Sequence, residues 1–253
     1  ETAAESGING GDITGYAEAK TTEQFESGEV AYLLGEAFGQ TLGEDDTPVL
    51  GGDKVYFGYT DCSDAEKVYS NTELLVEKPA HVFANGFCTV CDAFEPAKYN
   101  NNCSTDDESD DFYEISNAGQ LYWFADKVNN DNANFGSANA VLTADIVVNE
   151  GVMDENSTDV RAWTPIGNDS TPYTGTFDGN GKTVSGLYFN KSGVNFVGLF
   201  GGVGTNGTVK NIGVINSYFN GYYYVGGVVG YSYDSTIANC YNTGTVIGNE
   251  GVG

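Results

Sequence analysis

Four residues in one short stretch have side chains that bind transition metals: Cys62, His81, Cys88 and Cys91. His81 is the only histidine of the chain, and the two-residue gap between Cys88 and Cys91 is common in zinc knuckles. Three thiolates and one imidazole make a closed tetrahedral site of the structural kind. The spacing therefore predicts a structural zinc ion in a segment too small to build much core.

Disulfide bonds are an equal alternative for the same cysteines, because an exported protein meets an oxidising compartment. Cys62 can pair with Cys88, Cys91 or Cys103. Redox catalysis by the Cys88–Cys91 pair is disfavoured, since no βαβ pattern of the thioredoxin type surrounds it. Cys240 lies apart and is expected to be a free, buried, small apolar side chain.

Tyrosines crowd into the last third of the chain, and they are the second group that can do chemistry. Exposed aromatic rings stack on pyranose rings or anchor a protein partner. The alternative is that like residues simply stack on one another within the fold. The candidate ligand-stacking residues are Tyr222, Tyr223, Tyr224, Tyr231 and Tyr233.

Catalytic residues are not evident. Asp145 and Asp178 are the candidate carboxylates, but an Asp in the Asp-Gly-Asn-Gly sequence at 178–181 is typical of a turn. Arg161 and Lys182 are the nearest cations in sequence, and the single histidine argues against a Ser-His-Asp triad. The chain is therefore predicted not to be an enzyme.

Composition narrows the class of protein. The 36 acidic residues outnumber the 10 basic ones, giving a net charge of −26, which argues against nucleic acid and anionic membranes as partners. No window reaches the roughly 18–20 apolar residues needed to cross a bilayer. With 35 Gly and 17 Tyr, the composition is typical of an extracellular all-β surface protein.

Changes in composition suggest the organisation of the chain. Residues 1–20 are expected to be a flexible leader, 21–105 a small acidic module containing the cysteines, 106–111 an acidic linker, and 112–253 a second domain. The sequence begins at Glu1, with no initiating Met and no export signal, so a processed form is expected. Any export signal would lie outside this sequence.

Local patterns predict two helices among short strands. Apolar spacing favours a helix over 22–38 and another over 117–128, the latter capped by Ser116. Strands are expected at 54–59 and 140–148. From Trp163 onward the chain contains only short apolar runs broken by Gly and Asn, with no helical period.

Internal repeats decide the predicted fold. Residues 196–201 align with 225–230, and residues 208–212 align with 236–240, a shift of 28 to 29 residues. One repeat holds three short strands, which suits one coil of a three-faced parallel β-helix. The residues expected to point inward are Leu199, Val228, Ile237 and Val246, and the helix near 117–128 is expected to cover the N-terminal end of the stack.

Several motifs in order give these repeats a family resemblance. Residues 225–230 with 237–244 resemble the GLUG repeat of bacterial surface proteins, and 142–146, 163–167 and 173–184 are similar to its lead-in. The resemblance covers about 112–253 and implies right-handed β-helices of large adhesins and secreted enzymes, in which the repeats are generally not catalytic. Residues 22–105 are similar to a segment that accompanies such repeats.

The sequence thus predicts a mainly β chain: a right-handed parallel β-helix with an N-terminal capping helix, preceded by a small acidic α+β, loop-rich module. The predicted function is non-catalytic adhesion, ligand or glycan binding, or rigid display at the cell surface or outside it. A β-helix lyase or hydrolase acting on polysaccharides is one alternative. The other is that the N-terminal module binds and the β-helix is a spacer.

The expected partners are an extracellular glycan or a surface protein of a host or bacterium, without nucleic acid and without direct membrane insertion. Val252-Gly253 aligns with the start of the repeat at Val225, so further coils are expected beyond it. An open coil end would also favour self-association.

Overall fold

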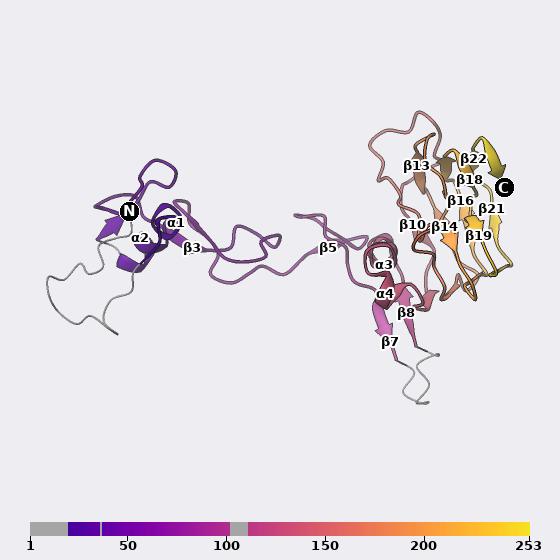
Figure 1. Cartoon of the computed structure of the whole chain (residues 1–253), viewed down its shortest axis with the longest axis horizontal. Helices are drawn as coiled ribbons and strands as arrows, with labels where there is room; N and C mark the ends of the chain where they lie inside the picture. Colours follow the sequence, from indigo (N-terminus) through magenta and orange to yellow (C-terminus); the bar gives the residue numbers. More distant parts are fainter. Residues whose placement is uncertain (1–19, 36, 102–110) are drawn as a thin grey trace. The chain divides into compact units, whose positions relative to one another are not determined.

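The structure, a computed structural model, describes residues 20–35, 37–101 and 111–253 (Figure 1). The chain divides into two units. Unit 1 comprises Glu1–Val82 and Thr89–Ala93, and unit 2 comprises Phe83–Cys88 and Phe94–Gly253. The division falls within residues 82–94. The expected leader at 1–20, except Lys20, and the expected linker at 106–111, except Asp111, lie outside the described residues.

Unit 1 is built from short elements around a small aromatic cluster. The rings of Tyr32, Phe57 and Tyr69 lie 4.5 to 5.9 Å apart between centroids. Buried Gln40 ties the surrounding loops together, because its Nε2 donates to the carbonyl oxygens of Phe25 and Asp45. The elements are α1 (Thr22–Glu26), α2 (Glu29–Leu34), β1 (Phe38–Gly39), β2 (Val49–Leu50), β3 (Tyr56–Gly58) and β4 (Val68–Ser70).

The prediction of one continuous helix over 22–38 is wrong. Two short helices, α1 and α2, replace it, because the chain turns at Gly28, whose φ of 89° is left-handed. A Cβ at this position would also press against the side chain of Leu42. The apolar spacing runs on across the turn and so does not indicate the break. The glycine at position 28 does indicate it, because glycine adopts left-handed backbone without strain.

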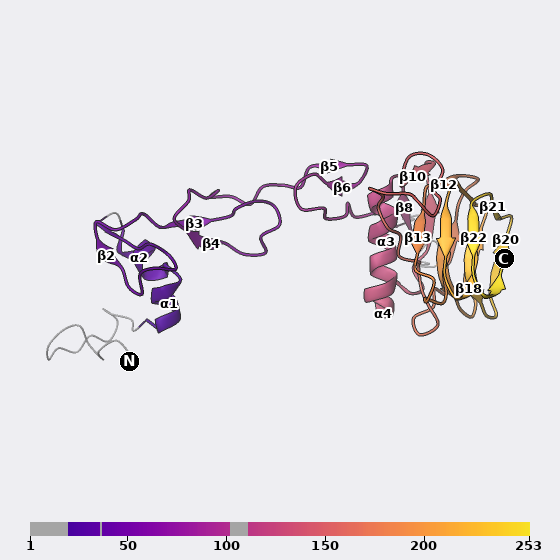
Figure 2. The same ribbon diagram turned by 90° about the horizontal axis from the view of Figure 1, so that it is seen from above.

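Unit 2 begins with a hairpin and a helix. The antiparallel hairpin β5 (Phe83–Ala84) and β6 (Phe87–Cys88) precedes β7 (Lys98–Asn100) and β8 (Phe112–Ile115), which also pair antiparallel. The helix α3 (Ala118–Asn130) follows, and then α4 (Asn132–Phe135). Figure 2 shows α3 at the end of the strand stack where the chain enters it.

The cap of α3 differs from the expected one. Asn117, rather than Ser116, is the N-cap, since its Oδ1 accepts from the backbone N–H of Gln120 at 2.9 Å. Ser116 instead donates to the side chain of Gln120 from both its backbone N–H and its hydroxyl. Both residues satisfy polar groups at the start of the helix, where four backbone N–H groups lack helical partners.

The rest of unit 2 is a stack of short strands that pair in parallel across sequence repeats. Thr208 pairs with Thr236 and Phe200 with Val229, as the internal alignment predicts. One sheet is mixed, because β7 adds an antiparallel strand to its edge. The strand orders are β10-β12-β16-β21, β20-β15-β11-β9-β8-β7, β13-β17-β22, β14-β19 and β18-β23.

These strands are two to four residues long, and short turns join most of them (Figure 1). Their bounds are β9 (Ala140–Leu142), β10 (Ile146–Val147), β11 (Thr176–Asp178), β12 (Thr183–Ser185), β13 (Tyr188–Asn190), β14 (Phe200–Val203), β15 (Thr208–Lys210), β16 (Gly213–Ile215), β17 (Tyr218–Asn220), β18 (Tyr223–Val225), β19 (Val229–Ser232), β20 (Thr236–Ala238), β21 (Tyr241–Asn242), β22 (Thr245–Ile247) and β23 (Glu250–Val252). Longer connections at 148–175 and 191–199 separate β10 from β11 and β13 from β14.

The core of unit 2 lies inside the stack and under α3. Phe124 of α3 packs edge-on against Tyr173, and both are fully buried. Among the residues expected to point inward, Leu199 and Val228 are buried and Val246 is half-buried against the core. The predicted burial of Ile237 is wrong. Its side chain is 38% exposed, because no further strand covers β20 among the described residues.

The prediction of a mainly β chain is confirmed, with only four helices in the described residues. None of those helices has the length and the apolar character that crossing a bilayer requires.

Gly119 provides a test of how α3 is seated. Alanine normally stabilises a helix interior by about 1 kcal/mol relative to glycine. Here the added Cβ would overlap the carbonyl oxygen of Gly86 in the β5–β6 hairpin. Gly119→Ala is therefore expected to lower the free energy of unfolding by about 1–3 kcal/mol, measured by chemical denaturation.

Gly193→Ala is the matched control, because open space surrounds that position and its backbone is not left-handed. Its effect is expected to stay within about 0.5 kcal/mol. Equal stability of the Gly119→Ala chain and the unaltered chain would contradict this packing.

Candidate functional site

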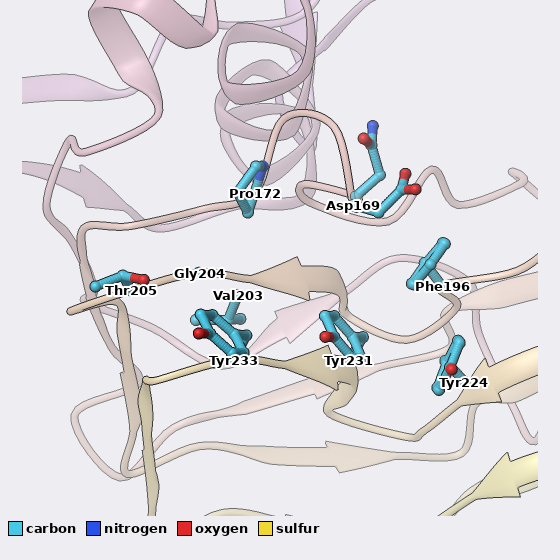
Figure 3. Close-up of a pocket in the computed structure, with 10 residues that line it drawn as sticks. Asp169, Pro172, Phe196, Val203, Gly204, Thr205, Tyr224, Tyr231 and Tyr233 are labelled. Atoms are coloured by element: carbon cyan, nitrogen blue, oxygen red, sulfur yellow. The ribbon is translucent and has the colours of Figure 1, made fainter.

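One side of unit 2 carries a pocket of about 470 Å³ with aromatic rings along one wall (Figure 3). Tyr231 lies in β19 (Val229–Ser232), Tyr233 directly follows its last residue, and both rings stand on the same wall of the pocket. Phe196 and Tyr224 continue this wall. We call these four residues the aromatic wall.

The rings of the aromatic wall contact one another closely. Phe196 and Tyr224 stack with centroids 5.2 Å apart and planes 14° apart. Tyr231 meets both rings edge-on, at 5.7 Å from Phe196 and 5.2 Å from Tyr224. Tyr224, Tyr231 and Tyr233 remain 42%, 36% and 64% exposed. The wall therefore offers ring faces to solvent although it is internally packed.

Two of these rings sit on left-handed backbone. Of the eleven described non-glycine residues with positive φ, nine are Asn or Asp, and the other two are Phe196 (61°) and Tyr224 (57°). A bulky side chain in this region costs roughly 1–2 kcal/mol. Hydrogen bonds from the backbone N–H of Phe196 to Tyr223 and of Val197 to Tyr224, each 3.0 Å, hold the two turns in place. Such strain at paired positions is typical of a functional surface.

Polar groups line the opposite side of the pocket. Figure 3 shows Asp169 and Pro172 on a loop facing the row of tyrosines. Asn168 also lines the pocket, and its Oδ1 accepts from the backbone N–H groups of Ser170 and Thr171, which shapes the loop. Thr205, which follows β14 beside Gly204, also lines the pocket.

The five tyrosines expected to bind a ligand fall into two groups. Tyr224, Tyr231 and Tyr233 line the pocket. Tyr222 and Tyr223 pair with each other outside it, with ring centroids 4.1 Å apart and a hydroxyl hydrogen bond of 3.3 Å. The left-handed conformation of Tyr224 also interrupts the alternation of side chains that a regular strand would give residues 222–224.

Phe196, Asn168 and Asp169 were not recognised from the sequence. For Phe196 the repeat alignment was one residue out of register, because it sets Phe196 against Val225, whereas the structure pairs Val197 with Val225 and stacks Phe196 on Tyr224. The loop at 168–172 is not in the alignment, since it has no counterpart in the later repeats.

The cysteines and the histidine of the first motif lie together. Cys62 Sγ is 3.6 Å from Cys91 Sγ, and Cys91 Sγ is 3.3 Å from His81 Nδ1. Cys88 ends β6 and leads into the turn to Cys91, and all four ligand atoms lie within 4.8 Å of one another. We call these four residues the Cys–His cluster.

Cys103, the other cysteine considered for a disulfide, lies outside the described residues. Cys240 is half-buried against the core, and its thiol donates to the carbonyl oxygen of Ala238 at 3.2 Å. Burial raises the pKa of this thiol, so it remains protonated at neutral pH.

The carboxylates considered for catalysis are held in turns. Asp145 Oδ1 accepts from the backbone N–H and the hydroxyl of Thr183, which lower the pKa of its carboxyl group. Burial acts to raise the pKa of Asp178, but hydrogen bonds from Asn211, from the backbone of Asn180 and from Lys210 prevail and lower it. Both groups are therefore ionised at neutral pH, unlike a general acid.

The nearby cations, Arg161 and Lys182, were considered as partners of these carboxylates. The guanidinium group of Arg161 stacks over the ring of Phe87 at 3.7 Å. Lys210, rather than Lys182, forms the ion pair with Asp178, at 3.4 Å.

The family model of the GLUG motif matches residues 221–247. This chain contains a GLUG motif. The matched segment runs from Gly221 to the end of β22 and includes Tyr224, Tyr231 and Tyr233. No solved structure matches the chain.

Two curated proteins are similar to parts of the chain. Halomucin of Haloquadratum walsbyi is 40% identical over 108 residues, which are 40% of this chain and 1% of that protein. A protein of Evansella cellulosilytica described as a Gly-rich membrane protein is 38% identical over 56 residues, 22% of this chain and 6% of that protein. The chain thus spans only a small fraction of the length of either relative.

Tyr224 allows the cost of the left-handed backbone to be measured. Tyr224→Asn relieves the strain, since Asn tolerates this region, but it loses ring contacts worth about 0.5–1.5 kcal/mol. The two effects oppose each other, so the free energy of unfolding should change by less than about 1 kcal/mol.

Tyr224→Val loses the same ring contacts and keeps a β-branched side chain at positive φ, where it is least tolerated. Chemical denaturation should show it to be about 1–2 kcal/mol less stable than Tyr224→Asn. Equal stabilities for the two variants would mean that the conformation is not strained.

Proposed function

We propose that this chain is a non-catalytic part of a larger extracellular or cell-surface protein and that it binds neutral carbohydrate in the pocket of the aromatic wall. In this proposal residues 112–253 form a right-handed parallel β-helix whose repeats carry the pocket. The observation on which the proposal rests is the row of exposed rings facing a polar loop across one cavity.

Regular pairing supports the β-helix. Thr208 pairs in parallel with Thr236, and Phe219 with Val246, so neighbouring strands come from successive repeats. Five parallel ladders of this kind run through the described part of unit 2, so one repeat carries five short strands where three were predicted. Their succession along the chain is the pattern of stacked coils. Each coil buries its inward side chains only through its neighbours.

Composition and the two relatives support a location at the surface. The relatives are described as a halomucin and a membrane protein, and the chain's net charge of −26 keeps it soluble and away from anionic surfaces. Many Gly and Tyr residues with few charged ones fit an extracellular β protein.

The chemistry of the pocket favours a sugar. Ring faces such as those of Tyr231 and Tyr233 bury the apolar C–H face of a pyranose. The amide of Asn168, the carboxylate of Asp169 and the hydroxyl of Thr205 provide donors and acceptors for its hydroxyl groups. A few directed polar groups among apolar ones are typical of small-molecule sites.

Charge favours a neutral sugar over an acidic one. The pocket is lined by one carboxylate, Asp169, and by no Lys or Arg among the described lining residues. An anionic uronate or sulfate would meet Asp169 and a strongly negative chain without a compensating cation. Neutral oligosaccharides are therefore the predicted ligands.

A catalytic role is not proposed, because Asp145 and Asp178 are committed to turn hydrogen bonds that keep them ionised. Glycoside hydrolysis needs one carboxylic acid with a raised pKa beside a second carboxylate.

Binding by single-ring variants tests the proposal. The full chain is applied to an array of neutral and uronate-containing oligosaccharides, and the dissociation constant of the best ligand is then measured by calorimetry. Tyr231→Ala and Tyr233→Ala should each weaken binding about 2- to 10-fold, because each removes one stacking surface. The double variant should weaken it further.

Tyr241→Ala is the matched control, because Tyr241 is 52% exposed, lies on β21 and does not line the pocket. Its affinity should equal that of the unaltered chain. A preference for uronate-containing glycans, or an equal loss in Tyr241→Ala and Tyr231→Ala, would overturn the proposal.

A further inference from the structure

The Cys–His cluster is independent of the aromatic wall and needs its own explanation. Cys62 and Cys88 are each only 3% exposed. Buried thiols gathered around one imidazole are more than a chance grouping of surface side chains.

The separations fit ligands around one metal ion. Tetrahedral zinc with Zn–S bonds of about 2.3 Å and a Zn–N bond of about 2.05 Å places its ligand atoms about 3.5–3.8 Å apart. The observed 3.6 Å from Cys62 Sγ to Cys91 Sγ and 3.3 Å from Cys91 Sγ to His81 Nδ1 lie close to these values. A disulfide between Cys62 and Cys91 would instead require about 2.05 Å.

The surrounding chain buries few side chains, although β4 pairs with β3 and Tyr69 stacks on Phe57. Within residues 59–85, all of which the structure describes, Cys62 is the only buried residue. A segment of this length without a hydrophobic core usually needs a cross-link or a metal ion to stay folded. The one side chain that the segment buries is also one of the four ligands.

We propose that Cys62, His81, Cys88 and Cys91 bind one Zn²⁺ ion as a structural site. The three thiols bind as thiolates and release their protons to the buffer, and the neutral imidazole binds through Nδ1. Four protein ligands close the coordination sphere, so no open position remains for a substrate. The ion replaces the missing core of residues 59–85.

Metal content and metal affinity test the site. The full chain, purified under reducing conditions with Zn²⁺ present, should hold one zinc ion per chain by elemental analysis. Cys62→Ser and Cys91→Ser should weaken zinc binding more than about 100-fold in competition with a chromogenic chelator, because even changes behind a ligand weaken metal binding 10- to 100-fold. Cys240→Ser removes a thiol outside the cluster and should bind zinc like the unaltered chain.

Two further measurements keep the test independent of whether a variant folds. Co²⁺ added to the unaltered metal-free chain should give the absorption of tetrahedral cobalt bound by three thiolates. Removal of zinc with a chelator should speed hydrogen exchange in residues 59–82, while exchange in residues 112–253 stays unchanged.

The proposal is overturned if the unreduced chain contains no zinc and its mass shows a disulfide among Cys62, Cys88 and Cys91. It is also overturned if Cys62→Ser binds zinc as tightly as Cys240→Ser. Neither result bears on sugar binding, so the two proposals fail separately.

Discussion

Parallel pairing between successive repeats is the constraint on which unit 2 depends. The strands β9 to β23 are two to four residues long, too short to be stable alone, and each finds backbone partners on a parallel strand from a neighbouring turn of the stack. The register places equivalent side chains directly above one another, about 4.8 Å apart. Tyr188 therefore stacks on Tyr218, and the side chain of Asn239 donates to that of Asn211.

The same constraint creates the aromatic wall. Phe196 and Tyr224 stack because an isolated parallel bridge between Val197 and Val225 sets their backbones side by side, and both rings sit on left-handed backbone. The residues that directly follow the two rings in sequence, Val197 and Val225, are fully buried. A change of ring at either position thus alters the surface without changing the core beside it.

Repetition made much of this predictable from sequence. The alignment of 208–212 with 236–240 identifies Thr208 and Thr236 as partners, and the structure pairs them. The tyrosines of 222–233 were recognised as candidates by their number alone. The amino acids do not reveal which of them share a pocket, because that depends on Tyr224 taking a backbone conformation that Tyr rarely adopts.

Other features were beyond the reach of local patterns. The turn at Gly28 divides a helix whose apolar spacing is continuous, because local backbone conformation overrides periodicity there. Asp169 faces the tyrosines from a loop outside the repeat, so no period points to it. The Cys–His cluster was predictable as a group from residue type and spacing, but spacing leaves metal and disulfide equally open, and the zinc proposal rests on the distances between the atoms.

The central claim, that the pocket of the aromatic wall binds neutral carbohydrate, is tested most directly by a crystal structure of the full chain. The crystals are soaked with the best neutral oligosaccharide from the array. The account predicts a pyranose ring lying flat against Tyr231 or Tyr233, with hydroxyl groups hydrogen-bonded to Asn168 or Asp169. A sugar bound elsewhere on the chain while this pocket holds only solvent would contradict it.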